Sequence, residues 1–350
     1  MKIKKILVYT NGELLGDGLY KLDFINNLRS NFPKAKIFWL CGGEKTVYSK
    51  LLEPLSKNLI HKVIDIKKEK ISLIHFILKS YSKNNKYDVV IDTQSSILKT
   101  VIIKMINHKI FLSATANWLF SSFSPTIHTE KKIRLIDKLN SFVEILFRQT
   151  HKSNAKINLY HIKIPNEHLN LSKKLLPLRN KYVGIAPGAG DKDKIWPLKN
   201  FIEVAKFIVE KKLIPVFFIG PGELHLVEIL KKEIDCALFP ELDNIAIKSG
   251  LTGPILAIAL ANRLILSIAN DSGTGHIFSK SRTSLILLFS KHDPKKYAPN
   301  SSKVTIIDSK TFGGKEPSLI PYSLVLSKIF EKLKLLIEFF SHQAQISFLL

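Results

Sequence analysis

The stretch "KILVYTNGELLGDGLYKLDFINNLRSNF" at residues 5–32 contains, in order, an apolar run, a glycine-rich turn and a helical pattern. The apolar run is short, continuous and rich in Ile, Leu and Val, which is typical of a strand buried on both faces. After the turn, apolar residues recur at helical spacing and predict an amphipathic helix. A buried strand followed by such a helix predicts the first unit of a parallel α/β sheet.

The same alternation continues along the chain and predicts two α/β domains in tandem. Strand-like runs in the first half lie at residues 36–41, 62–66 and 88–94, and a further helix-like stretch lies at 75–85. A second series of strand-like runs lies at residues 182–188, 214–220, 262–271, 284–290 and 303–308. The polar segment from about 154 to 180 contains Pro165 and Pro177 and is interpreted as the connection. Parallel sheets covered on both faces bind ligands at the carboxyl ends of their strands, so we expect the ligand in the cleft between the halves.

The length and composition predict a folded cytoplasmic protein. The chain has 350 residues, of which 45% are hydrophobic, and it contains no apolar run long enough to cross a bilayer. The apolar run after the basic start "MKIKK" is shorter than the core of a signal peptide. Cys41 and Cys236 have no metal-ligand spacing, so two reduced thiols are expected, without a disulfide or a zinc site.

The charge is compatible with an anionic partner, and the alternative interpretation is that lysines scattered among Ile and Asn reflect an AT-rich genome. Lysine and arginine number 53 against 29 acidic residues, a formal net charge of +24. Basic and aromatic residues do not alternate as in a surface that stacks single strands, so nucleic acid is not predicted as a partner. We expect peripheral contact with an anionic membrane, on the inner face of the cytoplasmic membrane. The apolar pattern at 323–340 predicts a terminal helix, interpreted as a packing helix in preference to an interfacial anchor.

Asp17 follows the first predicted strand, within the glycine-rich turn. Gly12, Gly16 and Gly18 do not have the dinucleotide spacing G-x-G-x-x-G, so a nicotinamide cofactor is not predicted. The glycines permit a tight turn that brings a ligand close to the backbone and to Asp17. The alternative interpretation is that Asp17 caps the helix.

The sequence "IAPGAGDKDKIWPLKNF" at 185–201 predicts a turn between a strand and a helix that approaches an anion. Gly188 and Gly190 free the backbone, and Lys194 is the cation nearest the helix start. The G-K-[ST] ending of a P-loop is absent, so ATP hydrolysis is not implied. The alternative interpretation of Lys194 is a solvated side chain in a charged turn.

A second turn of this kind lies in "SIANDSGTGHIFSK" at 267–280. Gly273 and the Ser272 hydroxyl could donate hydrogen bonds to an anion, so the two turns together fit a diphosphate. Asp271 is interpreted as a brace, or as a contact to another part of the ligand. His276 is interpreted either as a structural residue or as a phosphate ligand. Glu223, in "FFIGPGE" at 217–223, could bind a ribose diol or cap the next helix.

With these segments in order, the chain resembles glycosyltransferase family 9, the ADP-heptose:lipopolysaccharide heptosyltransferases and their relatives. The resemblance rests on "LGDGLYKL", "PGAGDKDKIWP", "FFIGPGE" and "ANDSGTGH", which extend over nearly the full chain. It implies a GT-B fold, α/β, with two Rossmann-like domains whose parallel sheets face a central cleft. The expected parts are an acceptor domain at 1–165, a nucleotide-sugar domain at 178–318, and a C-terminal helix at 319–350 that packs back on the first domain.

The family's functional residues carry over by motif. Asp17 matches the proposed general base and Lys194 matches the lysine on the donor phosphates, so both are expected to be catalytic. The remaining donor-site residues implied by the resemblance are Gly188, Gly190, Glu223, Asp271, Ser272, Gly273 and His276. The stretch "FSKHDP" at 289–294 departs from the family's usual "FGPTDP" beside the nucleotide site, which leaves base recognition and sugar identity open.

The resemblance implies an inverting transfer of a sugar, heptose from ADP-heptose, to a lipid A-linked core acceptor, without a cofactor or a metal ion. "DKD" at 191–193 has metal-binding spacing but lies in the matched lysine loop, so metal independence is preferred. Two alternatives stay open. One is a non-catalytic GT-B-like scaffold at anionic membrane surfaces, and the other is a GT-B transferase that uses a UDP-sugar.

Overall fold

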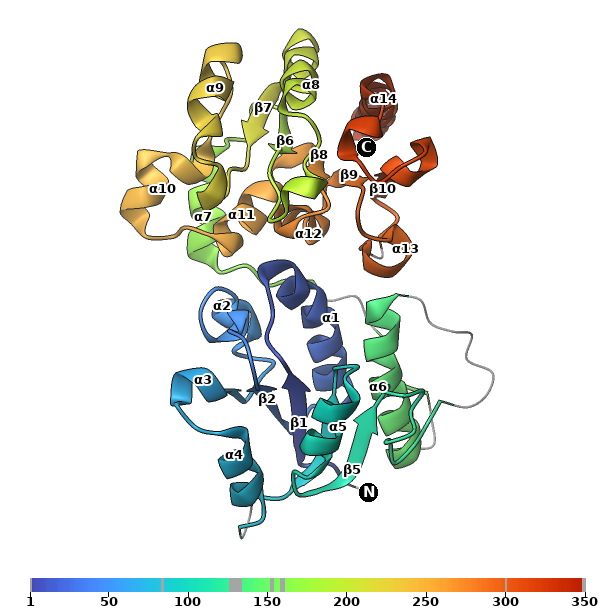
Figure 1. Cartoon of the computed structure of the whole chain (residues 1–350). Coiled ribbons are helices and arrows are strands. Elements are labelled where there is room, and N and C mark those ends of the chain that lie inside the picture. The colour runs from blue at the N-terminus through green and yellow to red at the C-terminus, as the bar shows by residue number, and fades with distance from the viewer. Residues whose placement is uncertain are drawn as a thin grey trace. The chain divides into compact units, whose positions relative to one another are not determined.

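The computed structural model of the chain describes residues 2–82, 85–125, 134–151, 154–157, 161–299 and 301–347, with 336–347 described by backbone alone. The chain divides into two compact units, Met1–Lys163 and Ile164–Leu350, called unit 1 and unit 2. Each unit contains one five-stranded parallel sheet with helices on both faces (Figure 1). The predicted α/β class with two parallel sheets is therefore confirmed.

Unit 1 has the strand order β3-β2-β1-β4-β5. Its strands are β1 (Lys5–Thr10), β2 (Lys36–Cys41), β3 (Lys62–Asp65), β4 (Tyr87–Asp92) and β5 (His108–Ser113). Its described helices are α1 (Leu15–Asn31), α2 (Glu53–Ser56), α3 (Ile66–Glu69), α4 (Leu73–Ser80), α5 (Ile97–Lys104) and α6 (Leu135–Thr150), with a 3₁₀ turn η1 (Val47–Ser49). The strand order reverses between β1 and β4, which places the loops after these two strands side by side.

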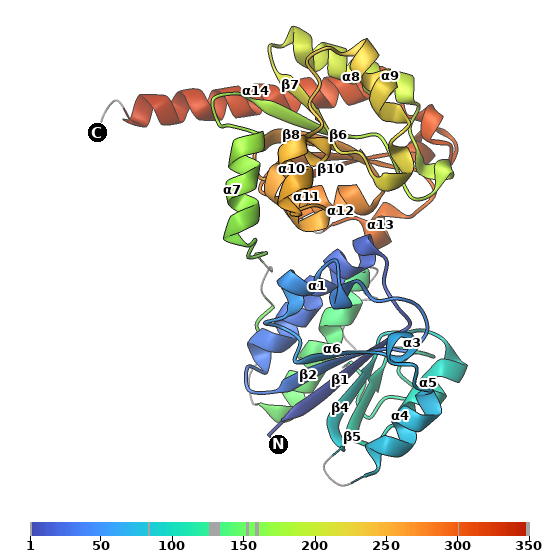
Figure 2. The same cartoon turned by 90° about the vertical axis from the view of Figure 1, so that its left-hand side faces the viewer.

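The helices of unit 1 cover both faces of its sheet. On one face α1 lies beside α6, where the Asn27 amide donates a 3.1 Å hydrogen bond to Asn140 Oδ1. On the other face lie α4 and α5 (Figure 2), whose buried residues Phe76 and Ile103 share one apolar cluster with Leu7 of β1. Strands β1 and β4 are buried because both of their faces are covered, as their continuous apolar sequences predict.

Unit 2 has the strand order β10-β9-β8-β6-β7. Its strands are β6 (Tyr182–Ala186), β7 (Ile214–Phe217), β8 (Leu264–Asn270), β9 (Ser284–Phe289) and β10 (Val304–Asp308). Its described α-helices are α7 (Asn166–Leu175), α8 (Leu198–Glu210), α9 (Leu226–Glu233), α10 (Asn244–Ser249), α11 (Pro254–Ala261), α12 (Gly273–Ser279), α13 (Pro294–Tyr297) and α14 (Tyr322–Ser347). The order reverses between β6 and β8, so the loops after these strands share one edge of the sheet.

The core of unit 2 explains two features of its helices. Residues of α8, α9 and α14 pack in one cluster against the sheet, and Val325 and Ile329 of α14 are fully buried there. This supports the packing interpretation for that part of the terminal helix. All of α11 is buried because its sequence is apolar on every side.

The segment predicted to connect the two domains contains a helix, and the two cysteines are free as expected. The segment at 154–180, interpreted as a connection, contains α7, which buries Leu171 and His168. The thiols of Cys41 and Cys236 are free, and burial raises the pKa of Cys41 to about 12.

Within the described part of the chain, no helix is both long and apolar enough to cross a membrane.

Candidate active site

Asp17 lies in the first turn of α1, and its side chain is exposed. No hydrogen bond or ion pair joins this carboxylate to any other residue that the structure describes. The helix N-cap is Leu14, which makes no side-chain cap, so the interpretation of Asp17 as a cap is wrong. The Asp17 carboxylate is therefore open to solvent and able to accept a proton from a bound molecule.

Close packing fixes the turn that carries Asp17. Gly12 has a φ of +133°, a conformation that favours glycine, and a Cβ at this position would overlap Glu44. A Cβ at Gly18 would overlap Val47, and the Gly18 carbonyl accepts a 2.7 Å hydrogen bond from the Tyr48 hydroxyl. The first turn of α1 is thus held against the segment after β2.

A buried ionic cluster, which was not predicted from the sequence, lies beneath this turn. Glu13 Oε1 accepts a 3.0 Å hydrogen bond from the Trp39 indole and lies 3.7 Å from Lys21 Nζ. Lys21 also donates a 3.2 Å hydrogen bond to the Thr10 hydroxyl. The sequence offered one indication of this cluster: Glu13 and Lys21 lie eight residues apart in a segment otherwise expected to be buried, where charged side chains are usually paired.

Lys194 ends a 3₁₀ turn, η2 (Lys192–Lys194), in the loop after β6. Its side chain is 15% exposed, and Nζ lies 3.7 Å from Oδ2 of Asp271 and 3.5 Å from the Asp271 carbonyl oxygen. Asp271 directly follows β8, the neighbour of β6. The interpretation of Lys194 as a solvated side chain is therefore wrong, because its ammonium is held at the point where the strand order reverses.

Asn270 ties the same two loops together and is a second residue that the sequence analysis missed. Its Oδ1 accepts a 3.1 Å hydrogen bond from the backbone N–H of Trp196, and its Nδ2 donates a 2.8 Å hydrogen bond to the Pro187 carbonyl. The Asn270 side chain is fully buried. Because Trp196 and Pro187 flank Lys194 in sequence, this amide fixes the loop that carries the lysine.

Asp271 is buried, and one of its carboxylate oxygens lies close to a lysine and a histidine. His292 Nδ1 lies 2.7 Å from Asp271 Oδ2, and Lys194 Nζ lies 3.7 Å from the same oxygen. The 3.7 Å separation from Lys194 is too long for a hydrogen bond, and among the described residues none hydrogen-bonds to this buried oxygen. This geometry fits the interpretation of Asp271 as a brace for Lys194. A contact of Asp271 with another part of the ligand stays a prediction.

The stretch "SKHD" after β9, which departs from the family pattern, is tied to the lysine loop. Lys291 Nζ lies 2.9 Å from Asp191 and 3.5 Å from Asp193, the two carboxylates of "DKD". The hydrogen bond from Lys291 lowers the pKa of Asp191, and the same bond raises the pKa of Lys291. These two carboxylates are paired with a cation of the protein. No group of three or more His, Cys, Asp or Glu side chains that could hold a metal ion occurs among the described residues.

Glu223 ends the turn η3 (Pro221–Glu223) after β7, and its carboxylate points back toward that strand. Oε2 accepts a 2.7 Å hydrogen bond from the Gly220 N–H. The helix α9 begins at Leu226 after His225 and has no side-chain cap, so the interpretation of Glu223 as a cap for α9 is wrong. A Cβ at Gly188 would overlap the Glu223 carboxylate, whereas a Cβ at Gly190 would have no neighbour within 4 Å.

The turn at 271–276 leads into α12. Ser272 is the N-cap of this helix, and its hydroxyl accepts a 3.3 Å hydrogen bond from the Gly275 N–H. Gly273 is the first helical residue, and His276 is half-buried one turn later. A Cβ at Gly275 would lie 2.7 Å from Leu287 Cδ1, so this glycine lets α12 pack on the sheet. The Ser272 hydroxyl therefore has a capping role in addition to the expected donor-site role.

Unit 2 brings the predicted donor residues to one edge of its sheet. Gly188, Gly190 and Lys194 follow β6, Glu223 follows β7, and Asp271, Ser272, Gly273 and His276 follow β8. Lys194 contacts Asp271, and Gly188 contacts Glu223. Asp17 belongs to unit 1 and follows the first strand of that unit.

Comparisons with known proteins agree on one family. The family model described as glycosyltransferase family 9 (heptosyltransferase) matches residues 78–318. The lipopolysaccharide core heptosyltransferase OpsX of Haemophilus influenzae is 22% identical over 335 residues, covering 89% of this chain and 88% of that protein.

Solved structures show the same fold. A family 9 glycosyltransferase from Veillonella parvula superposes with a TM-score of 0.71 at 20% identity, covering 95% of this chain and 98% of that chain. Heptosyltransferase WaaC of E. coli, solved with ADP, gives a TM-score of 0.65 at 15% identity, covering 94% of this chain and 99% of that one. The GT-B class of fold implied by the sequence resemblance is confirmed.

Proposed function

Because the chain belongs to glycosyltransferase family 9, we propose that this transferase moves a heptose from ADP-heptose to a hydroxyl of a lipid A-linked lipopolysaccharide core, with inversion. The relatives support this choice of substrates, since OpsX is a lipopolysaccharide core heptosyltransferase and WaaC was solved with ADP. The observation that carries the proposal is the contact between Lys194 and Asp271. It places a half-buried cation among the loops that match the donor motifs of the family.

Lys194 binds the diphosphate of the donor in this proposal. As the bond from the anomeric carbon to the diphosphate breaks, negative charge grows on the departing ADP. An ammonium on a side chain that is only 15% exposed stabilises that charge more strongly than one in water, because few water molecules screen it. Lys194 is held in place before the donor arrives, so little reorganisation is needed. The proposed reaction is independent of a metal ion because this ammonium provides the required positive charge.

The remaining donor-site residues bind the other parts of the nucleotide sugar. Glu223 Oε1 is proposed to accept a hydrogen bond from the ribose, while Oε2 stays on the Gly220 N–H. Asp271 is proposed to hold Lys194 in place and to contact a part of the donor other than the diphosphate. Gly188, Gly190, Ser272, Gly273 and His276 are proposed to line the donor, as the family motif implies.

Asp17 acts as the general base. The acceptor hydroxyl attacks the anomeric carbon from the face opposite the diphosphate, through an oxocarbenium-like state, and loses its proton as the new bond forms. Asp17 takes that proton, a role usually worth about a hundred- to ten-thousand-fold in rate. The carboxylate is exposed and has no partner among the described residues, as a base that must reach a substrate requires.

The proposal includes a cytoplasmic site of action and peripheral contact with the inner face of the cytoplasmic membrane, where a lipid-linked acceptor is reached. A donor screen read by mass spectrometry, with purified lipid A-core acceptors, tests the function. Transfer of heptose from ADP-heptose is the expected result. Transfer from a UDP-sugar alone would overturn the donor assignment. Neither transfer nor calorimetric binding with any nucleotide sugar would instead indicate a non-catalytic scaffold.

A further inference from the structure

Two neighbouring helices of unit 1 expose apolar side chains on their outer faces. On α4 and its C-cap these are Ile74, Leu78 and Tyr81, and on α5 and its C-cap they are Ile97, Leu98, Val101 and Met105. Their exposed fractions lie between 44% for Val101 and 71% for Leu98. We call these seven residues the α4/α5 surface. Single exposed apolar residues are common, but two adjacent stripes of them indicate a binding surface.

The exposure does not arise from helices that fail to pack. On α4, Phe76 and Ile77 are buried in the core, while Ile74 and Leu78 point the other way. On α5, Ile103 is buried in the same cluster, while Val101 is exposed. Each helix therefore has a core face and, in addition, an apolar outer face, whereas an ordinary surface helix has a polar outer face.

The two apolar stripes form one surface. The Tyr81 hydroxyl donates a 2.8 Å hydrogen bond to the Met105 carbonyl, and the Asn107 N–H donates a 2.8 Å hydrogen bond to the Ser80 hydroxyl. These bonds join the C-terminal ends of α4 and α5. Both views show the two helices on the same side of the sheet (Figures 1 and 2).

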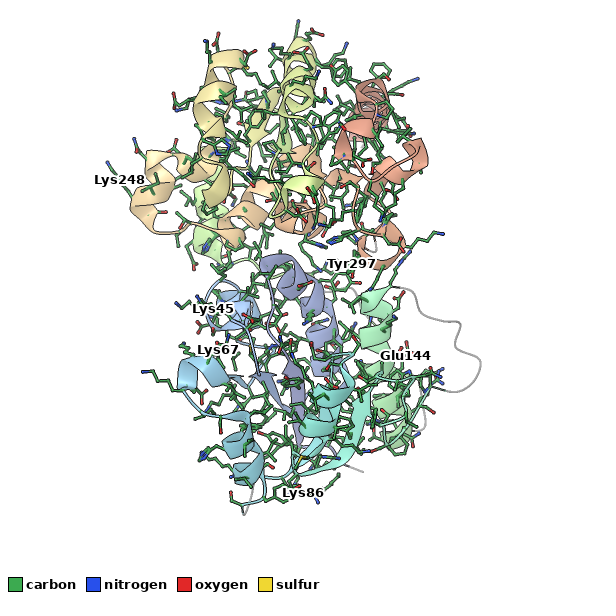
Figure 3. The ribbon with its side chains drawn as sticks, in the orientation of Figure 1. Lys45, Lys67, Lys86, Glu144, Lys248 and Tyr297 are labelled. Carbon is green, nitrogen blue, oxygen red and sulfur yellow. The ribbon has the colours of Figure 1, made fainter. Side chains whose placement is uncertain are left out.

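The surroundings of this surface are positively charged. Residues 70–109 contain seven lysines and two acidic residues, Asp88 and Asp92, and both acids are buried. Four of the lysines are exposed and have no acidic partner among the described residues: Lys70, Lys79, Lys86 and Lys104. Lys86 lies at the lower edge of unit 1 in Figure 3. On α8 and α14, by contrast, Lys206 and Lys328 are paired with glutamates.

We propose that the α4/α5 surface docks unit 1 on a lipid bilayer that carries anionic headgroups. The apolar side chains enter the boundary between headgroups and acyl chains, and the four lysines contact lipid phosphates. A bilayer matches both properties of the surface, because it presents apolar material beneath negative charge. The inference rests on the proposed function, which includes peripheral contact with the membrane, and it names the surface of unit 1 that makes this contact.

Co-sedimentation of the full chain with vesicles tests the inference, at about 0.1 M salt. We expect binding to phosphatidylcholine vesicles that contain about a third phosphatidylglycerol, and little binding to phosphatidylcholine alone. The variant Lys79→Gln/Lys104→Gln should bind the anionic vesicles about tenfold more weakly or worse, and Leu78→Asn/Leu98→Asn should also bind about tenfold more weakly. Equal binding to both kinds of vesicle, or unchanged binding of both variants, would overturn the proposal.

The control is Ile247→Asn/Lys248→Gln on α10, which changes an exposed apolar residue and an exposed lysine of unit 2. It should bind vesicles like the wild type, and an equal loss there would overturn the assignment to α4 and α5. The rival occupant of the surface is a second copy of the chain, which analytical ultracentrifugation without lipid would detect as a dimer. A wild-type dimer that Leu78→Asn/Leu98→Asn dissociates would overturn the membrane assignment in favour of this second copy. Vesicle binding needs no turnover, so it can fail or succeed independently of the proposed transferase activity.

Discussion

The ammonium of Lys194 lies 3.7 Å from the Asp271 carboxylate, although 77 residues separate the two in sequence. The sheet produces this contact, because β6 and β8 are adjacent and both residues follow the carboxyl ends of their strands. The buried carboxylate would repel a diphosphate if it stood alone. With the Lys194 ammonium 3.7 Å from one of its oxygens, that negative charge is partly offset.

We expect Lys194→Ala to weaken the binding of ADP by about 2 to 4 kcal/mol, because a half-buried cation is lost and Asp271 is left to repel the phosphates. Isothermal titration calorimetry measures this directly. The matched control is Lys192→Ala, which removes an exposed lysine of the same 3₁₀ turn and should leave the affinity within about 0.5 kcal/mol of the wild type. Equal affinities of wild type and Lys194→Ala would remove the lysine from the donor site.

Asp17→Asn should lower the rate of transfer by about a hundredfold or more while leaving the affinity for ADP unchanged, because only the proton acceptor is lost. Single-turnover transfer and calorimetry together make the two measurements. Glu53→Gln serves as the control, since Glu53 is another exposed carboxylate in the first turn of a unit 1 helix. A wild-type rate for Asp17→Asn would exclude the general-base role.

Gly188→Ala should destabilise unit 2 by about 1 to 3 kcal/mol, because its Cβ would overlap the Glu223 carboxylate. Moving that carboxylate also breaks its 2.7 Å hydrogen bond with the Gly220 N–H. Gly190→Ala adds a methyl group with no neighbour within 4 Å and should change stability by about 0.5 kcal/mol or less. Urea denaturation of the two variants compares them, and equal stabilities would show that Gly188 has no packing role.

Much of the fold was predictable from the sequence because buried parallel strands are continuous apolar runs. The runs at 182–188 and 262–271 contain β6 and β8, and the residues that follow them lie together as the rule for strand ends predicts. Lys194 and Asp271 could therefore be assigned to one ligand site from the sequence alone.

The side-chain partners were not predictable in the same way. The contact of His292 with Asp271, and that of Glu13 with Trp39, depend on loop conformations and rotamers that no spacing rule determines. The spacing of residues in the sequence also did not determine whether Asp17 caps the helix or is an exposed carboxylate. That choice depends on where α1 begins, and helix ends are the least predictable part of a helix.

Asp88 stabilises the amino ends of the strands in unit 1. Its carboxylate accepts hydrogen bonds from the N–H groups of Lys4 and Lys5, at 2.8 and 3.0 Å, and from Lys109 Nζ at 2.7 Å. Burial alone raises the pKa of Asp88, but the hydrogen bonds from Lys109, Lys4 and Lys5 together outweigh it and lower the pKa below its ordinary value. The folded state therefore favours the ionised carboxylate more than the unfolded chain does.

A lowered folded-state pKa has a definite sign in the stability of the protein. The contribution of Asp88 should be fully present above about pH 4, near the unfolded pKa, and should be lost as the pH falls through the folded pKa. Asp88→Asn should cost about 1 to 3 kcal/mol at neutral pH and remove this part of the acid dependence. Lys109→Met keeps both backbone bonds and should cost less, since Lys109 is half exposed. Urea denaturation at a series of pH values measures the free energy of unfolding of the wild type and both variants. If this free energy falls with acid as steeply in Asp88→Asn as in the wild type, the assignment to Asp88 is contradicted.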